Sequence, residues 1–271
     1  MSAEAPHPFD LDTALVPAGA GRWSATAPEH WFVGRGPNGG FLAALVARAA
    51  GAAAGRPLRS VTLHFLAAPG AGPLEVTAAV ERNGRSFTVV SARIEQAGRP
   101  VTLALATLGA LGNAGAEWNG SAPPAALPAA EAAPVPAEAT GTPAFFRNYE
   151  LRPALRAAGG EETGGWLRTA APRALDAPLA VAMADAWMPS AFVALGRTVA
   201  APTLDLTIHL RRPLPPPDMA PEDFVLVRFA TRLSVAGVWE EDGELWTPGG
   251  ELLAQSRQLA LARELPARPP R

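Results

Sequence analysis

The sequence predicts an α+β protein of two tandem units, in each of which one helix faces a curved antiparallel sheet. The first observation is an internal repeat: residues 60–66 (SVTLHFL) are echoed by residues 205–211 (DLTIHLR), at an offset of 145. Residues 98–104 (GRPVTLA) are echoed more loosely by residues 250–256 (GELLAQS), at an offset of 152. Two echoes in the same order indicate a duplicated unit. The second observation is that each half has one Ala-rich apolar stretch and about four stretches of strand-like composition, an arrangement in which helix and sheet bury each other.

The composition is that of a globular protein. The chain has 271 residues, 48% hydrophobic and 18% charged, with a net charge of −2 and no long run of one sign. Nothing in this balance favours nucleic acid or an anionic membrane as a partner. The absence of cysteine excludes disulfides, a thiol nucleophile and thiolate metal sites. The N-terminus lacks a signal-peptide pattern and no apolar run reaches the length of a membrane span, so we expect a cytoplasmic protein.

The N-terminal unit, residues 1–112, is predicted to contain a helix and then four strands. Residues 39–55 place Phe41, Leu42, Leu45 and Val46 in an Ala-rich background with glycines at both ends, which predicts the helix. Pro69-Gly70, Asn83-Gly84 and Ala97-Gly98 separate the strand-like stretches, and Asn-Gly is a strong signal for a tight turn between antiparallel strands. The predicted strands are residues 58–67, 74–82, 85–96 and 100–110.

The pattern restarts after an Ala- and Pro-rich segment, residues 113–142, which is predicted to be an extended linker. The C-terminal unit, residues 143–271, begins with a predicted strand over residues 145–151. A helix is predicted from Asp176, a plausible N-cap followed by Pro178, to about Gly196. The remaining predicted strands are residues 203–211, 223–235, 237–247 and 251–263.

A glycine motif precedes the first helix. Residues 34–39 match G-x-G-x-x-G, but dinucleotide binding also needs a parallel βαβ unit and an acidic residue about 20 positions on. Around position 59 the sequence has no acid, and the following strands are expected to be antiparallel. We therefore interpret the motif as a glycine loop that enters a helix. The backbone N–H groups of Gly39 and Gly40 could stabilise a developing negative charge there.

Other familiar catalytic patterns are absent from the sequence. It has no G-x-S-x-G nucleophile motif. His7, His30, His64 and His209 have no metal-ligand spacing, so no metal or bound cofactor is predicted. His64 and His209 occupy matching positions in the two repeats, which favours partly buried structural histidines over catalytic ones.

A comparison of the two halves singles out polar residues in the second. The first helix carries no acid, whereas Asp185 is the one carboxylate among nine otherwise apolar residues, 179–187. A buried carboxylate needs hydrogen-bond partners or a raised pKa, and such a group can act as a general base. An acid on the solvent face of an amphipathic helix would give the same pattern. Thr203 corresponds to Leu58 and Gln258 to Ala106, so in both cases a polar residue of the second half replaces an apolar one. Asp185, Thr203 and Gln258 could together hold a water molecule.

At these positions the chain resembles the double-hotdog acyl-CoA thioesterase II family over nearly its whole length. The resemblance rests in the first half on residues 37–40 (PNGG), 63–70 (LHFLAAPG) and 81–87 (ERNGRSF), and in the second on 184–185 (AD), 203–205 (TLD) and 253–258 (LAQSRQ). It implies two hotdog units, each a central helix wrapped by an antiparallel sheet. The family's catalytic Asp, Thr and Gln fall on Asp185, Thr203 and Gln258. The family commonly has His and Glu where this chain has Leu206 and Leu259, so these two differences bear on substrate choice and turnover.

The resemblance implies hydrolysis of an acyl-CoA thioester to the free acid and CoA. Asp185 would deprotonate water, Thr203 and Gln258 would position it, and N–H groups near Gly39 or Gly40 would polarise the carbonyl. One alternative is a hydratase or dehydratase acting on an enoyl thioester, for which Asp205 and His209 are the candidate pair. Another is a non-catalytic protein that binds acyl thioesters. Hotdog units commonly associate, which is compatible with a homodimer.

Overall fold

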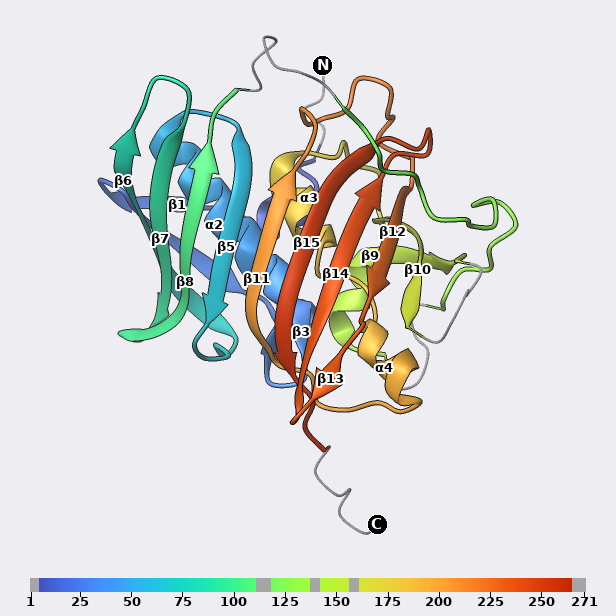
Figure 1. Ribbon diagram of the computed structural model, residues 1–271. Helices are drawn as coiled ribbons and strands as arrows, with labels where there is room; N and C mark the ends of the chain where they lie inside the picture. The colour runs from blue at the N-terminus through green and yellow to red at the C-terminus, as the bar shows by residue number, and fades with distance from the viewer. Residues whose placement is uncertain (1–4, 111–117, 137–141, 156–160, 265–271) are drawn as a thin grey trace.

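The computed structural model describes residues 5–110, 118–136, 142–155 and 161–264 (Figure 1). The elements of the first half are α1 (Pro8–Asp12), β1 (Val16–Gly19), β2 (Arg22–Ala27), η1 (Glu29–Trp31), β3 (Phe32–Val33), β4 (Gly36–Pro37), α2 (Gly39–Ala54), β5 (Leu58–Phe65), β6 (Gly72–Asn83), β7 (Thr88–Gln96) and β8 (Arg99–Leu108). Those of the second half are η2 (Ala144–Asn148), β9 (Tyr149–Pro153), β10 (Glu162–Thr169), α3 (Ala177–Met183), α4 (Ser190–Leu195), β11 (Thr203–Leu210), β12 (Val225–Ala230), β13 (Ser234–Val235), β14 (Val238–Trp246) and β15 (Leu252–Leu261).

One antiparallel sheet runs through both halves, with α2 and α3 behind it in Figure 1. Among the described residues its strands follow the order β1-β2-β6-β7-β8-β5-β11-β15-β14-β12-β10-β9, and β13 pairs with β14. Each half repeats the same order in the opposite direction, so β5 and β11 meet at the centre. There Thr62 faces Thr207, with 3.1 Å between the two Oγ1 atoms. The predicted α+β double hotdog is confirmed.

The strand register confirms the internal repeat at both offsets. In the first half Val61 pairs with Ala106, and in the second Leu206 pairs with Gln258. The register also shifts at matching places, between Leu58 and Ser60 on β5 and between Thr203 and Asp205 on β11. The duplication therefore includes a β-bulge, an irregularity that changes which face of the sheet a side chain occupies.

The helix α2 is buried on nearly all sides. Phe41 and Leu45 have no exposed surface, because the sheet of the first half covers one side of α2 and α3 covers another. Its ends carry the expected caps: Asn38 accepts a hydrogen bond from the backbone of Phe41, and Gly55 adopts the left-handed conformation. No helix of the described chain is long and apolar enough to cross a membrane.

The prediction for the second helix was wrong beyond its first two turns. Asp176 does cap α3, but α3 ends at Met183 and a separate helix, α4, begins at Ser190. Pro189 immediately precedes α4, and a proline disfavours helical geometry in the residue before it. Asp185 therefore lies in the turn after α3 and not inside a helix.

Three other local predictions need correction. Residues 145–151 do not form one strand, because η2 occupies Ala144–Asn148 and β9 begins at Tyr149. The predicted strand 223–235 ends at Ala230 and resumes only briefly as β13. The described part of the predicted linker is partly packed: the backbone N–H groups of Leu127 and Val135 donate to β9 and its flank, and Ala132 is buried. The elements before α2, and β10, were not predicted.

The glycine motif at residues 34–39 lies in a hairpin and not in a dinucleotide-binding unit. The short strands β3 and β4 pair antiparallel and lead directly into α2. The strand after α2 also pairs antiparallel with its neighbours, so the parallel βαβ unit that dinucleotide binding requires is missing from this part of the described chain.

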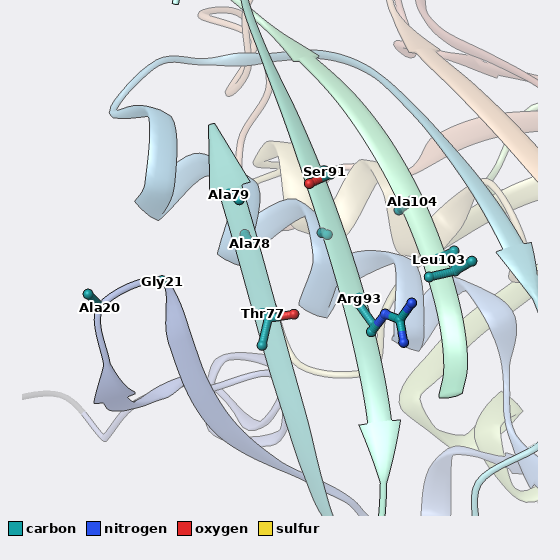
Figure 2. A pocket seen from close by; sticks show the side chains of 10 residues that line it. Ala20, Gly21, Thr77, Ala78, Ala79, Ser91, Arg93, Leu103 and Ala104 are labelled. Atoms are coloured by element: carbon teal, nitrogen blue, oxygen red, sulfur yellow. The ribbon is translucent and has the colours of Figure 1, made fainter. Parts of the chain in front are cut away.

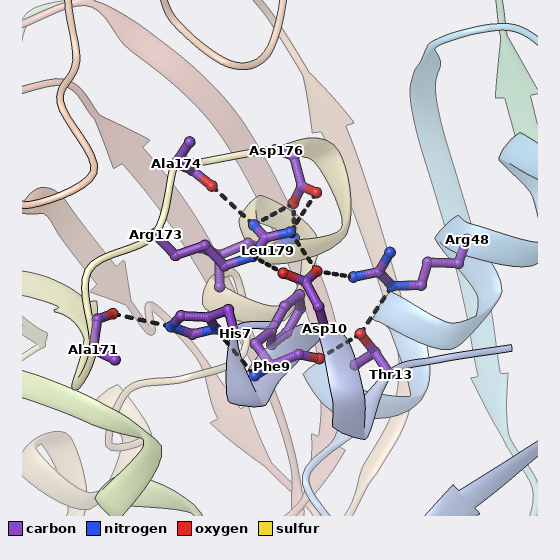
Figure 3. Close-up of polar contacts among 10 residues, drawn as sticks. All are labelled: His7, Phe9, Asp10, Thr13, Arg48, Ala171, Arg173, Ala174, Asp176 and Leu179. Carbon is purple, nitrogen blue, oxygen red and sulfur yellow. Dashed lines mark hydrogen bonds and ion pairs between the residues drawn. The ribbon is translucent and has the colours of Figure 1, made fainter. Parts of the chain in front are cut away.

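Ion pairs join α1 to both central helices, as Figure 3 shows. Arg173, whose side chain is 11% exposed, donates to Asp10 on α1 and to Asp176, the N-cap of α3. Arg48 on α2 also reaches Asp10, with 2.6 Å between Nη2 and Oδ1. The guanidinium of Arg173 lies over the ring of Phe9, 5.0 Å from its centroid. This cluster fixes the N-terminal helix against the elements that carry the polar residues described below.

We expect Arg173→Met to destabilise the protein by roughly 2 kcal/mol, because it removes the mostly buried shared partner of two acids whose own side chains are more than a third exposed. The measurement is the free energy of unfolding in urea. Arg22→Met is the matched control, since Arg22 forms an exposed pair with Glu75 that should contribute less than about 1 kcal/mol. Equal losses in the two variants would contradict the expectation.

Candidate active site

Asp185 lies against the N-terminus of α2, although it belongs to the other half of the chain. The backbone N–H of Gly40 donates to its Oδ2 at 2.8 Å, and the side-chain amide of Asn38 donates to the same oxygen at 3.0 Å. These donors stand at the positive end of the α2 dipole, which favours a negative charge there. Asp185 keeps part of its surface exposed while the residues on either side of it are buried. The structure thus excludes a freely solvated acid on an amphipathic helix.

Asn38 contacts both α2 and Asp185, and it was not predicted as a site residue, although residues 37–40 carry part of the resemblance. Its Oδ1 caps α2, while its Nδ2 donates to the backbone oxygen of Asp185 at 2.7 Å as well as to the carboxylate. An Asn immediately before a helix signals an N-cap. The sequence does not show that the side-chain amide of Asn38 donates to Asp185, a residue 147 positions away.

The surroundings of Asp185 raise its pKa to about 7. Burial is the largest cause, since it penalises the charged form, and the nearby carboxylate of Glu241 acts in the same direction. The hydrogen bonds from Gly40, Asn38 and Gly39 lower the pKa and so offset part of the effect. A carboxyl group with a pKa near 7 can both take and release a proton near neutral pH.

Thr203 and Gln258, predicted from the comparison of the halves, are brought together by the β-bulge on β11. Simple alternation would place Thr203 on the same face as Asp205, but the register shift between them turns Thr203 to the inner face. The hydroxyl of Thr203 donates to Oε1 of Gln258 at 2.9 Å. Thr203 is partly exposed and Gln258 is buried.

Glu241 on β14 completes this group of polar residues and was missed by the sequence reasoning. Its Oε1 accepts from the side-chain amide of Gln258, and its Oε2 accepts from both the backbone N–H and the hydroxyl of Ser190, each at 2.6 Å. The hydroxyl of Ser190 also contacts that of Thr231. The available signal was strand alternation, because Glu241 shares a face with the buried Trp239 and Leu245.

The two groups lie close together but do not touch through a direct hydrogen bond. Asp185 bonds to neither Thr203 nor Gln258. The backbone oxygen of Ala184, next to Asp185, lies 3.5 Å from the hydroxyl of Ser256, which precedes Gln258 by two residues on the inner face of β15. This contact places the turn that carries Asp185 next to the strand that carries Gln258.

Gly39 and Gly40 occupy positions where a side chain would not fit. A methyl group at Gly39 would lie 2.8 Å from Oδ2 of Asp185 and 3.0 Å from the ring of Phe65. One at Gly40 would overlap the carbonyl oxygen of Ala182. The N–H of Gly40 is directed at the Asp185 carboxylate, so in this structure it holds the acid and is not a free donor for a substrate.

Tyr149, at the start of β9, adds a buried hydroxyl that finds no hydrogen-bond partner in the described part of the protein. Its ring packs edge-on against Trp31, with the ring centroids 5.9 Å apart. The carbonyl of Trp31 in turn accepts the N–H of Asn38 at 2.8 Å. Burial raises the pKa of Tyr149, and so does the charge of Asp185, which keeps the hydroxyl protonated.

The outer face of the sheet carries the other residues that the sequence singled out. Both His64 and His209 are exposed there, so the prediction that they are partly buried was wrong. Leu259 also faces outward, whereas Leu206 is fully buried opposite Gln258. A hollow on this face, shown in Figure 2, lies over β6, β7 and β8 and is lined by Thr77, Ser91, Arg93 and Leu103. Ala20 and Gly21 of the turn between β1 and β2 also line it, and Asp185 does not.

Comparisons with known proteins identify relatives of both halves. Residues 27–109 match the model of the acyl-CoA thioesterase N-terminal domain, and residues 124–262 match that of the acyl-CoA thioesterase C-terminal domain. An uncharacterised protein of Mycobacterium tuberculosis is 31% identical over 269 residues, covering 86% of this chain and 88% of that protein.

Solved structures agree in fold. A hot dog fold protein of unknown function from Alicyclobacillus acidocaldarius has a TM-score of 0.86 and 25% identity, covering 97% of this chain and 100% of that one. A thioesterase II candidate from Thermobifida fusca has a TM-score of 0.82 and 26% identity, covering 94% and 97%. An acyl-CoA thioesterase II from Mycobacterium marinum, with a TM-score of 0.75 and 20% identity over 97% and 100%, is similar in fold.

Proposed function

This chain belongs to the acyl-CoA thioesterase family, and we propose that it hydrolyses acyl-CoA thioesters to the free carboxylic acid and CoA. The observation that carries the proposal is Asp185, a carboxylate with a pKa of about 7 that stands at a helix N-terminus. The neighbouring pair of Thr203 and Gln258 supports it, because hydroxyl and amide groups can orient water.

In the proposed reaction, a water molecule lies between Asp185 and the Thr203–Gln258 pair. Asp185 takes a proton from this water while the water oxygen attacks the thioester carbonyl carbon. The tetrahedral intermediate collapses by breaking the carbon–sulfur bond, and the thiol of CoA leaves with the proton that Asp185 held. One water is consumed for each acid and thiol formed, and the proposed reaction needs no metal or bound cofactor.

The N-terminus of α2 serves this reaction in two ways. Before attack, its N–H groups stabilise the charge on Asp185, as the contact with Gly40 suggests. During attack, negative charge moves from the acid to the thioester oxygen, and a protonated Asp185 accepts weaker hydrogen bonds. The N–H groups of Gly39 and Gly40 then become available to the oxyanion, which a helix N-terminus also favours.

The direct test is release of CoA from short-, medium- and long-chain acyl-CoAs, followed with a thiol-reactive dye. The protein has no cysteine, so it contributes no background signal. We expect release from at least one chain length. Saturable acyl-CoA binding without any release would instead favour the non-catalytic binding protein.

We also predict that kcat/KM depends on pH through Asp185. The base must be ionised to act, so kcat/KM should be constant above about pH 8. At pH values well below 7 it should decrease by about tenfold for each pH unit. The measurement is loss of the ultraviolet absorbance of the thioester at a series of pH values. A midpoint near pH 4 would contradict the proposed environment of the base.

The hydratase alternative receives no support from residue placement. Asp205 and His209 share the outer face of β11, on the side opposite to Thr203 and Gln258. Incubation with crotonyl-CoA should therefore give no 3-hydroxyacyl product in mass spectrometry, a readout that hydrolysis of the thioester does not imitate. The predicted domain boundaries, a cytoplasmic location and a homodimer stay predictions.

A further inference from the structure

Glu241 is a buried acid that the proposed hydrolysis does not use directly. Only 4% of its surface is exposed, and it extends from β14 toward the interior beneath α4. A buried carboxylate is costly unless donors satisfy it. Here donors reach both oxygens: Gln258 Nε2 reaches Oε1, while the N–H and hydroxyl of Ser190 reach Oε2. Burial raises the pKa of Glu241 above its usual value, whereas the hydrogen bonds from Ser190 and Gln258 lower it and so favour the ionised carboxylate.

The contact with Glu241 decides which way the amide of Gln258 faces. A carboxylate accepts hydrogen bonds, so it draws the NH₂ end of the amide toward β14. The carbonyl end then faces Thr203, whose hydroxyl donates to it at 2.9 Å. With this orientation fixed, the second N–H of the amide is the group left to contact a water molecule. Rotation of the amide would place two acceptors face to face at Glu241.

Glu241 also acts on Asp185 through its charge. Asp185 and Glu241 do not share a hydrogen bond, yet the negative charge of Glu241 raises the pKa of Asp185. The charge of Asp185 in turn raises the pKa of the Tyr149 hydroxyl, which stays neutral. Glu241 on β14 is thus an acid close enough to act on the base through its charge.

We infer that Glu241 is a positioning residue of this site, which holds the Gln258 amide in its productive orientation and keeps a negative charge near Asp185. The inference rests on the proposed hydrolysis, since it assigns Glu241 a role in that reaction. Glu241 contacts Gln258 and not the water of the proposed reaction, so it acts through Gln258.

The test begins with Glu241→Gln, which keeps the size of the side chain and removes its charge. We expect kcat to fall at least tenfold with KM little changed, because the Gln258 amide loses its fixed orientation. The acid limb of the pH profile should move to lower pH by on the order of one unit, because a like charge near Asp185 is gone. A purely structural role would lower the amount of active enzyme without moving this midpoint.

Two further variants sharpen the test. Glu244→Gln is the matched control: it removes the same charge from an outward position of β14, where the side chain pairs with Arg228. It should leave kcat and the pH midpoint unchanged. Glu241→Asp keeps the charge but shortens the side chain, so it should retain the midpoint and lower kcat. If Glu241→Gln fails to fold, Glu241→Asp still tests the positioning role. A wild-type kcat in Glu241→Asp would overturn that role.

The outcomes separate this inference from the proposed function. If the wild type releases CoA and Glu241→Gln matches it in kcat and pH midpoint, the inference is wrong and the hydrolase proposal stands. If the wild type releases no CoA from any substrate, the hydrolase proposal fails, and NMR of the Gln258 side-chain amide reads the orientation directly. One amide proton protected from exchange in the wild type and unprotected in Glu241→Gln supports the orientation; equal exchange overturns it.

Discussion

Asp185→Asn should lower the rate of CoA release by about a thousandfold, since removing a general base typically costs 10²- to 10⁴-fold. The substitution keeps the shape of the side chain, and the Asn oxygen can still accept the hydrogen bond from Gly40. The variant should therefore fold normally and still bind acyl-CoA. The measurement is dye-detected CoA release under saturating substrate, with binding checked by calorimetry.

The matched control for this variant is Asp205→Asn. Asp205 is also partly exposed and lies only two positions beyond Thr203, but it faces the outer side of the sheet. It should keep the wild-type rate. Near-wild-type release by Asp185→Asn, or a comparable loss in Asp205→Asn, would remove Asp185 from the role of base.

The same substitution should change how stability depends on pH. The pKa of Asp185 is raised from 3.8 to about 7 in the folded protein, so the folded state binds the proton more tightly than the unfolded chain. Its contribution to stability is thus fully present below about pH 4 and is lost as the pH rises through about 7. Asn does not titrate, so the Tm of Asp185→Asn relative to the wild type should be higher at pH 8 than at pH 5.

Gly40→Ala should have the second large effect, on stability and activity together. The added methyl group would overlap the carbonyl oxygen of Ala182 and lie 2.8 Å from Oδ1 of Asn38. Because one obstacle is backbone, α2 and α3 must move apart, at a cost of roughly 2–4 kcal/mol. The movement would also take the N–H of Gly40 away from Asp185, so we expect at least a tenfold fall in CoA release.

Gly51→Ala provides a control of opposite sign on the same helix. A methyl group there meets no atom within 4 Å, and alanine is a better helix former than glycine. It should stabilise the protein by roughly 0.5–1 kcal/mol and leave the rate unchanged. Urea unfolding of both variants makes the comparison, and similar changes of the same sign would refute the steric argument.

Much of the architecture could be read from local pattern. The helix at residues 39–55 and the strands around β5 to β8 follow from apolar composition and from turn dipeptides such as Asn83-Gly84. The offsets of 145 and 152 anticipated the strand register, because duplicated segments keep their pairing partners. The broken second helix was missed because the apolar pattern continues through Pro189, and the pattern alone does not show where the helix ends.

The sequence by itself determined the duplicated α+β fold and marked Asp185, Thr203 and Gln258 as the polar exceptions of the second half. Only the tertiary structure decided which of them meet. Asn38 and Gly40 reach Asp185 across the contact between the halves, the bulge on β11 turns Thr203 toward Gln258, and strand pairing sets Glu241 beside that amide. Local periodicity indicates which face of its own helix or strand a residue occupies. It does not indicate which distant segment covers that face, and the pKa and hydrogen bonds of a buried carboxylate depend on that segment.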